Sequence, residues 1–90
     1  MEKIYKYELE ITNLQSVSMP IGANVISANV QNGKLCIWAL VDTRNSDKNK
    51  SIAVAGTGYE IDFTVSDYDF YFVDTVMMSD ILVLHVYAHN

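Results

Sequence analysis

Asp74 and His85 are the residues whose types and spacing come closest to catalytic chemistry. If Ser79-Asp80 forms a two-residue turn between two strands, the carboxylate lies directly opposite the imidazole on one face of a sheet. A carboxylate that orients an imidazole is half of a hydrolytic triad, but no nucleophile stands beside this pair. A cross-strand polar pair explains the same spacing without chemistry. We therefore predict that the protein is not an enzyme and has no catalytic residue.

A second group of residues has the chemistry of an anion site. Half of the six basic residues lie in the polar run TRNSDKNK at 43–50, which is predicted to be an exposed loop. The turn Gly56-Thr57-Gly58 can offer backbone N–H groups to a phosphate. It lacks the lysine and the following helix of a P-loop, so a plain turn beside a solvated loop is the alternative. The candidate site for a small, nucleotide-like anion comprises Arg44, Lys48, Lys50, Thr57 and Gly58.

Aromatic residues predict a protein interface. Trp38, Tyr71 and Tyr87 belong to segments in which large apolar side chains point to both faces of a strand, and a core covers only one face. Tyrosine and tryptophan are enriched at protein interfaces. We expect a homo-oligomer that forms through an aromatic sheet face to which these three residues contribute, and a host protein is the alternative partner of such a surface.

Metal and thiol chemistry have little support in the sequence. His85 and His89 share a strand face but lie roughly 13 Å apart at about 3.3 Å per residue. Cys36 is the one cysteine, so no internal disulfide can form, and its apolar surroundings in sequence predict a buried thiol. We predict no metal site and no cofactor.

Charge and composition narrow the class of partner. The net charge of −5 argues against nucleic-acid binding, which needs a basic surface, and against docking on anionic membranes. The first ten residues are interrupted by charges and lack the apolar core of a signal peptide. No segment approaches the roughly 20 apolar residues of a membrane span. We expect a cytoplasmic protein that forms a single domain over residues 1–90.

The segment Asn24–Asp42 predicts a β-hairpin more strongly than any other part of the chain. Two apolar runs flank Asn32-Gly33, the dipeptide that most favours a two-residue type I′ turn. This turn predicts the apolar pairs Val30–Leu35, Ala28–Ile37 and Ile26–Ala39 on one face, and Gln31–Lys34, Asn29–Cys36, Ser27–Trp38 and Val25–Leu40 on the other. Since its second strand is apolar on both faces, it is predicted either to lie centrally in a sheet or to have its Trp38 face covered by another part of the structure.

The remaining chain shows short strand patterns separated by turn signals and no helical periodicity. We predict strands over 3–11, 15–19, 51–55 and 59–65, a turn at Ser66-Asp67, and a second hairpin over 69–89. In that hairpin the predicted pairs are Val76–Val83, Asp74–His85, Phe72–Tyr87, Met77–Leu82, Thr75–Leu84 and Val73–Val86. The predicted fold is an all-β, small antiparallel sandwich or barrel of about seven short strands, with little or no helix.

Several motifs are distributed over nearly the whole chain: IYKYEL at 4–9, MPIGANVIS at 19–27, VQNGKLCIWALVD at 30–42, GTG at 56–58, and FVDTV and LVLHVY within 72–87. In these motifs the chain resembles an uncharacterised family of small phage and prophage proteins. Two positions depart from the family pattern, because Asp74 replaces a glycine and Leu84 replaces a second tryptophan. The resemblance implies a phage-encoded accessory protein in the bacterial cytoplasm, and it implies no reaction.

These observations lead to one expected mode of action and two alternatives. We expect a non-enzymatic protein that acts by binding a host protein, in counter-defence or host takeover. The alternatives are sequestration of a small anionic ligand and a minor structural role in the virion.

Overall fold

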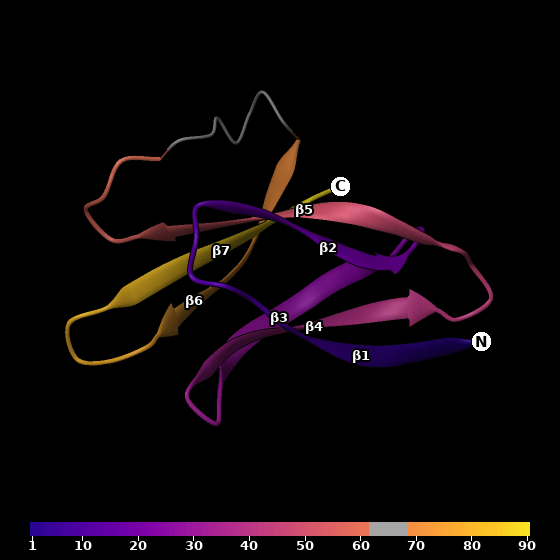
Figure 1. Cartoon of the computed structure of the whole chain (residues 1–90), viewed down its shortest axis with the longest axis horizontal. Coiled ribbons are helices and arrows are strands. Elements are labelled where there is room, and N and C mark those ends of the chain that lie inside the picture. Colours follow the sequence, from indigo (N-terminus) through magenta and orange to yellow (C-terminus); the bar gives the residue numbers. More distant parts are fainter. Residues whose placement is uncertain (62–68) are drawn as a thin grey trace.

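The computed structural model describes residues 1–61 and 69–90, and this part of the chain consists of seven β-strands joined by turns (Figure 1). The strands are β1 (Glu2–Glu8), β2 (Leu14–Pro20), β3 (Asn24–Gln31), β4 (Lys34–Asp42), β5 (Asp47–Gly56), β6 (Phe70–Met77) and β7 (Val83–His89). Within these residues no helix is long and apolar enough to cross a membrane.

The strands form two antiparallel sheets that pack into a small sandwich. The first sheet has the order β1-β4-β3 and the second has the order β2-β5-β7-β6. One apolar core lies between them, with its largest fully buried side chains supplied by β2, β4, β5, β6 and β7. The predicted all-β sandwich of about seven strands is therefore confirmed.

The first hairpin follows its turn chemistry until it meets a β-bulge. Asn32 and Gly33 both have positive φ angles, 53° and 76°, as a type I′ turn requires. The predicted pairs from Gln31–Lys34 to Ser27–Trp38 are all present. Beyond them Ile26 is the extra residue of a bulge, so the predicted pairs Ile26–Ala39 and Val25–Leu40 are wrong, and Val25 pairs with Ala39 instead. The bulge places Val25 in the core at 3% exposure and leaves Ile26 46% exposed.

Strand β4 is the central strand of the first sheet, as its apolar faces predict. Its residues Ile37, Ala39 and Val41 face the core. On the opposite face Cys36 is also buried, at 1% exposure, which confirms the predicted buried thiol. The Lys6 ammonium donates to the Gln31 side-chain oxygen at 2.6 Å, so the lysine stem spans β4 from β1 to β3.

The polar run at 43–50 is only partly a loop, which corrects the prediction for this segment. Strand β5 begins at Asp47, and its residues 47–50 pair with the end of β2. Backbone hydrogen bonds to a neighbouring strand do not depend on side-chain polarity, so a polar sequence at the end of a sandwich can still form a strand. The turn itself is limited to residues 43–46.

The second hairpin has a longer connection and a different register from the prediction. The Met78 N–H donates to the Leu82 carbonyl at 2.9 Å, so the loop is not the two-residue Ser79-Asp80 turn. Next to the loop the pairs are Met77–Val83, Val76–Leu84, Thr75–His85 and Asp74–Val86, which makes five of the six predicted pairs wrong. A bulge at Val73 restores the sixth predicted pair, Phe72–Tyr87.

The strand predicted over 59–65 can be compared with the structure only at residues 59–61. Tyr59, Glu60 and Ile61 lie outside any strand. The rest of this segment and the predicted turn Ser66-Asp67 lie outside the described residues.

The two bulged strands, β3 and β6, lie side by side where the edges of the two sheets meet. The Tyr71 hydroxyl accepts the Val25 N–H at 2.8 Å, and the Asp74 carboxylate accepts the Ala28 N–H at 3.3 Å. Edge N–H groups of β3 are thereby satisfied by side chains of β6 in place of another strand. We call this contact the seam.

Candidate functional site

Asp74 and His85 do not form a pair, because the register places them on opposite faces of the sheet. Asp74 turns to the seam, whereas His85 lies between two hydroxyl groups: Thr57 Oγ1 is 2.6 Å from Nε2 and Thr75 Oγ1 is 3.1 Å from Nδ1. In a neutral imidazole one nitrogen donates and the other accepts, so one threonine donates to the ring and the other receives from it. Within residues 1–61 and 69–90 no carboxylate is hydrogen-bonded to this histidine, and the predicted cross-strand pair of Asp74 with His85 is wrong. Neither pocket described below is lined by His85.

The turn Gly56-Thr57-Gly58 uses part of its hydrogen-bonding capacity within the fold. The Thr57 N–H donates to the Val83 carbonyl at 3.0 Å, and the N–H of the following Tyr59 donates to the Gly56 carbonyl at 3.1 Å. Thr57 and Gly58 also follow the far end of β5 from Lys48, roughly 30 Å away at about 3.3 Å per residue. Thr57 and Gly58 therefore cannot share a small ligand with the lysines.

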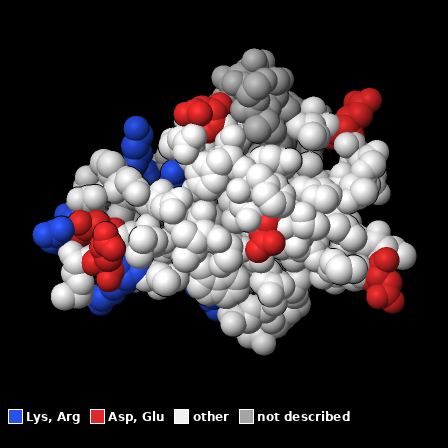
Figure 2. All heavy atoms as spheres, turned by 180° about the vertical axis from the view of Figure 1, so that it is seen from behind, with Lys and Arg blue, Asp and Glu red and all other residues white. Residues whose placement is uncertain are grey.

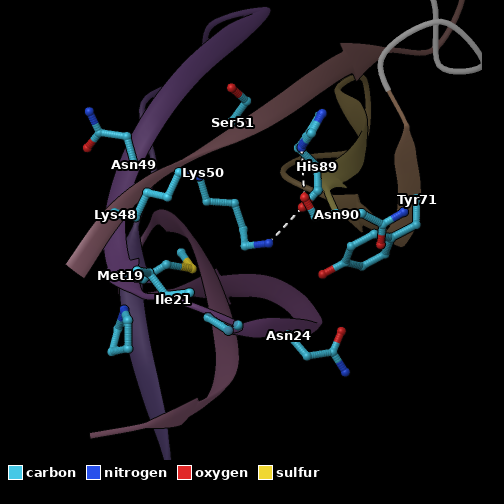
Figure 3. A pocket seen from close by; sticks show the side chains of 13 residues that line it. Met19, Ile21, Asn24, Lys48, Asn49, Lys50, Ser51, Tyr71, His89 and Asn90 are labelled. Carbon is cyan, nitrogen blue, oxygen red and sulfur yellow. Dashed lines mark hydrogen bonds between the residues drawn. The ribbon is translucent and has the colours of Figure 1, made fainter. Parts of the chain in front are cut away.

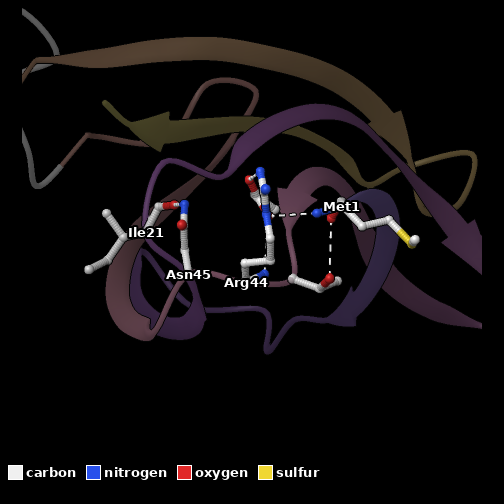
Figure 4. A network of polar contacts seen from close by, with 6 residues as sticks. Met1, Ile21, Arg44 and Asn45 are labelled. Carbon is white, nitrogen blue, oxygen red and sulfur yellow. Dashed lines mark hydrogen bonds and ion pairs between the residues drawn. The ribbon is translucent and has the colours of Figure 1, made fainter.

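Arg44 forms an ion pair with an acidic neighbour, and it lines neither the larger nor the smaller of the two pockets described below, both formed by described residues. Its guanidinium binds the Asp42 carboxylate at 2.7 and 3.0 Å, and the amino group of Met1 binds the same carboxylate at 3.0 Å (Figure 4). The bonds from Arg44 hold the pKa of Asp42 well below its usual range. Arg44 therefore belongs to an exposed ion pair and not to the predicted ligand site.

Lys48 and Lys50 are the two members of the predicted anion site that the structure brings together. They line the larger of the two cavities described here, about 580 Å³ in volume, at the end of the sandwich where β2 and β7 end and β3, β5 and β6 begin (Figure 3). We call this cavity the lysine pocket. Its lining residues are Met19, Pro20, Ile21, Gly22, Ala23, Asn24, Lys48, Asn49, Lys50, Ser51, Tyr71, His89 and Asn90.

The alternation of β5 carries both lysines into this pocket. Lys48 and Lys50 lie on the strand face that continues as Ile52 and Val54, which are buried in the core. The Lys50 ammonium donates to the His89 carbonyl at 2.7 Å, so its side chain reaches from β5 toward the end of β7 (Figure 3). Burial lowers the pKa of Lys50, because a partly desolvated ammonium group loses hydration.

Tyr71 forms another wall of the lysine pocket and links it to the seam. Its hydroxyl accepts the Val25 N–H, and a phenol that accepts one hydrogen bond keeps its own O–H as a donor. Burial raises the pKa of Tyr71, so the donor stays protonated at neutral pH. The amides of Asn24 and Asn90 add further donors and acceptors around the pocket.

The lining of the lysine pocket contrasts with the charge of the whole chain. The chain has eleven acidic and six basic residues, yet the lining includes two lysines and no acidic residue among those the structure describes. On the face in Figure 2, Lys and Arg gather mainly at one end beside several acidic side chains, and the middle carries little charge. The lysine pocket is therefore a locally basic site in an acidic protein.

The rim of the lysine pocket is held by the connection between β2 and β3. The Ile21 N–H donates to the Ser46 carbonyl at 2.9 Å, and the Asn45 side-chain amide donates to the Ile21 carbonyl at 2.8 Å (Figure 4). These two bonds tie the β2–β3 connection to the β4–β5 turn. Both bonds hold Ile21, so hydrogen bonds fix this part of the rim.

The predicted interface residues lie on three separate surfaces. Trp38 is on the outer face of the first sheet, and Tyr71 lines the lysine pocket. Tyr87 lies on the outer face of the second sheet, where its ring meets Phe72 edge-on with centroids 5.6 Å apart. One partner surface therefore cannot include all three residues.

Sequence reasoning missed most of the lysine pocket, although one signal for it was present. Every second residue from Lys48 to Val54 lies on one face of a strand, and along this face two lysines are followed by two apolar residues, Ile52 and Val54. The contributions of Asn24, Tyr71 and the 89–90 segment had no such signal, because they come from other strands. No three His, Cys, Asp or Glu side chains of residues 1–61 and 69–90 gather closely enough to hold a metal ion.

A smaller cavity lies at the opposite end of the sandwich. Its volume is about 350 Å³, and its lining residues are Ile11, Thr12, Asn13, Val54, Gly56, Tyr59, Glu60, Leu82 and Leu84. It contains no basic side chain among these residues, so it lacks the charge that an anion requires.

Comparison with known proteins gives one match. The family model described as a domain of unknown function, DUF7352, matches residues 1–90. No curated protein and no solved structure matches the chain.

Proposed function

The chain belongs to the DUF7352 family of domains of unknown function, and we propose that it binds a small anionic, nucleotide-like ligand in the lysine pocket without catalysing a reaction. The observation that carries this proposal is the placement of two of six basic residues, and no acidic residue, around one cavity of an acidic chain. The partial burial of Lys50 also supports this proposal. Its ammonium group has lost part of its hydration, and a bound anion would replace the lost interaction with water by a favourable charge interaction.

The size and lining of the lysine pocket favour a ligand with both an anionic and a flat polar part. Its volume of about 580 Å³ falls within the roughly 300–1,000 Å³ that is usual for small-molecule sites. Phosphate oxygens match Lys48 and Lys50, and the amides of Asn24 and Asn90 match the hydrogen-bonding edge of a base. Ile21, which is 49% exposed, adds an apolar side chain against which a ring can pack.

The biological setting we propose is that of a phage accessory protein in the bacterial cytoplasm. The resemblance to small phage and prophage proteins, carried by motifs such as MPIGANVIS at 19–27, supports this setting. Sequestering a nucleotide-like signal is a counter-defence activity that needs binding and no turnover. The described residues fit that requirement, because His85 lacks an orienting carboxylate and lines neither cavity.

Thermal denaturation with inorganic phosphate and with adenosine monophosphate tests the lysine pocket directly. A ligand that binds only the folded state stabilises it by about 2.7 kcal/mol at roughly 100 times its Kd. We expect this gain for at least one probe in the wild type and its loss in the double variant Lys48→Met/Lys50→Met. The matched control Lys3→Met/Lys34→Met removes two charges outside the pocket and is expected to keep the gain.

An equal gain in all three proteins would place the anion elsewhere and overturn the lysine pocket as the site. A gain that the control loses as well would show a response to net charge alone. Calorimetric titration of the wild type with the same two probes provides the Kd that the thermal shift must match.

A second candidate function is binding of a host protein through the outer face of the first sheet. The observation in its favour is the apolar row on that face, where Ile4 and Leu40 are 57% and 37% exposed and Trp38 is half-buried. Native mass spectrometry of the protein purified from expressing bacterial cells separates the two candidates. An added mass in the range of a nucleotide supports the lysine pocket, and the added mass of a second, different protein supports the outer face.

A minor role in the virion is the third candidate, and it rests on the phage resemblance alone. Proteomic analysis of purified particles tests it, because a structural component must be present there in stoichiometric amount.

A further inference from the structure

Strand β1 differs from the other six described strands because none of its residues is buried. It is the outermost strand of the first sheet and pairs only with β4 (Figure 1). Ile4 and Tyr5, on opposite faces of this strand, are 57% and 40% exposed. An edge strand with exposed apolar residues on both faces is a template for another strand.

The hydrogen-bond phase of β1 determines which backbone groups face outward. The Thr43 N–H donates to the Met1 carbonyl at 2.9 Å, and the Leu9 N–H donates to the Leu35 carbonyl at 2.8 Å. Because such pairs recur every second residue in an antiparallel ladder, the odd-numbered residues of β1 bond to β4. The N–H and carbonyl groups of Glu2, Ile4, Lys6 and Glu8 therefore point away from the sheet.

We propose that β1 pairs antiparallel with β1 of a second copy of this chain, with Ile4 opposite Ile4 on the two-fold axis. In this register Glu2 of each copy lies opposite Lys6 of the other. The two three-stranded sheets then join into one six-stranded sheet with the order β3-β4-β1-β1-β4-β3. The contact is isologous, so it closes as a dimer and does not propagate.

Side-chain charge selects this register over its neighbours. Shifting the strands so that Ile4 faces Lys6 places Glu2 opposite Glu8 twice, and shifting them further places Lys6 opposite Lys6. Like charges directly opposite one another are destabilising, whereas opposite charges contribute favourably. Only the Ile4–Ile4 register among these three has no like-charge pair.

The outer face of the first sheet continues across the proposed contact. Ile4 pairs with Leu40 on β4, so the new sheet carries an apolar row of Leu40, Ile4, Ile4 and Leu40 through its centre. Lys6 exchanges its exposed bond to Gln31 for the ion pair with Glu2 of the second copy. Charged residues on an edge strand also prevent unselective pairing, which is consistent with a partner whose charges match.

The other outer edge, β2, offers a poorer contact. The Val54 N–H donates to the Asn13 carbonyl, so the even-numbered residues of β2 face outward, and one of them, Pro20, has no N–H. Leu14, Ser16 and Ser18 carry no charge that could select a register. Strand β1 is therefore the edge to which we assign the dimer.

Sedimentation velocity of charge variants tests the proposal. The wild type is expected to sediment with twice the chain mass of 10.1 kDa. Glu2→Lys alone and Lys6→Glu alone each create two like-charge pairs, so each is expected to weaken dimerisation at least tenfold. The double swap Glu2→Lys/Lys6→Glu restores both opposite-charge pairs and is expected to restore the dimer, whereas Lys34→Glu, outside β1, is expected to leave it intact.

Ile4→Pro provides a second variant that leaves the monomer folded. The Ile4 N–H faces outward, so proline there removes no bond to β4 but does remove a donor from the proposed contact. We expect a monomer with the wild-type circular dichroism spectrum. A monomeric wild type overturns the proposal, and so does a dimer that persists unchanged in both Lys6→Glu and Ile4→Pro.

Discussion

The two hairpins of this protein look alike in sequence, yet their strands pair in different ways. In the β3–β4 hairpin, Asn32-Gly33 forms the turn and sets the register for the next five residues of β3. In the β6–β7 hairpin, Ser79-Asp80 does not form a two-residue turn. A longer loop joins the strands, and every pair from Met77 to Asp74 differs from the pair predicted from the sequence. A strong turn dipeptide determines the register of a hairpin. Where the turn dipeptide is weak, the register depends on the contacts that the two strands make with other strands.

The β-bulges in β3 and β6 indicate that contacts between these two strands influence the register of both hairpins. Ile26 bulges from β3 and Val73 bulges from β6, and these two strands meet at the seam. The bonds from Val25 to Tyr71 and from Ala28 to Asp74 lie on either side of the bulges. Each bulge therefore adjusts its strand so that polar groups of the two sheets meet.

The largest expected effect comes from the core face of the first hairpin. Ile37 has 0% exposure, so Ile37→Ala is expected to reduce the free energy of unfolding by about 2–5 kcal/mol through lost burial and a cavity. Ile81, in the loop of the second hairpin, is 95% exposed, so Ile81→Ala is expected to change the free energy of unfolding by less than about 0.5 kcal/mol. Urea denaturation of both variants checks the difference, and similar values for the two would contradict the described core.

The seam is expected to have the next largest effect. Tyr71→Phe leaves the Val25 N–H without its acceptor inside the protein, which is expected to cost about 1–3 kcal/mol. Phe72→Leu, one residue away and 55% exposed, is the matched control and is expected to cost less than half as much. Urea denaturation measures both, and equal losses would mean that the hydroxyl bond does not hold the two hairpins together.

The two turns provide the third test. Gly33 has a φ of 76°, so Gly33→Ala is expected to cost about 1–2 kcal/mol because an L-residue is disfavoured in this region. Asp80→Ala in the other hairpin changes an exposed loop residue and is expected to stay within about 0.5 kcal/mol. Thermal unfolding of the two variants should therefore show a larger loss of stability for Gly33→Ala than for Asp80→Ala. A larger loss in Asp80→Ala would mean that the second connection, and not the Asn32-Gly33 turn, contributes more to the stability of the fold.

The smallest expected effect is a pH dependence at the seam. Burial raises the pKa of Tyr71 above its ordinary value of 10.0, so the unfolded state loses this proton first as pH rises. The contribution of this group is complete below about pH 10 and is lost as pH rises through the folded-state pKa. The stability difference between wild type and Tyr71→Phe is therefore expected to narrow above about pH 10 in urea denaturation, and a constant difference would exclude a shifted tyrosine.

Part of the candidate site followed from sequence and part did not. Lys48 and Lys50 were predicted to bind an anion, and they line one pocket. Arg44 and Thr57 were predicted to join them, but each is occupied by a neighbour, Asp42 and His85 respectively. Residue type and spacing identify groups that can bind a ligand, but they do not reveal which of these groups the fold itself uses.

The sequence by itself determined the all-β class, the first turn and the pairing next to it, and the burial of Cys36. Each of these depends on residues close together in the chain: a turn dipeptide, or an alternation of period two within one strand. Only the tertiary structure decided the bulges, the register of the second hairpin and the lysine pocket. Their physical cause is contact between residues far apart in sequence, such as Val25 with Tyr71 and Lys50 with His89, which local patterns do not encode.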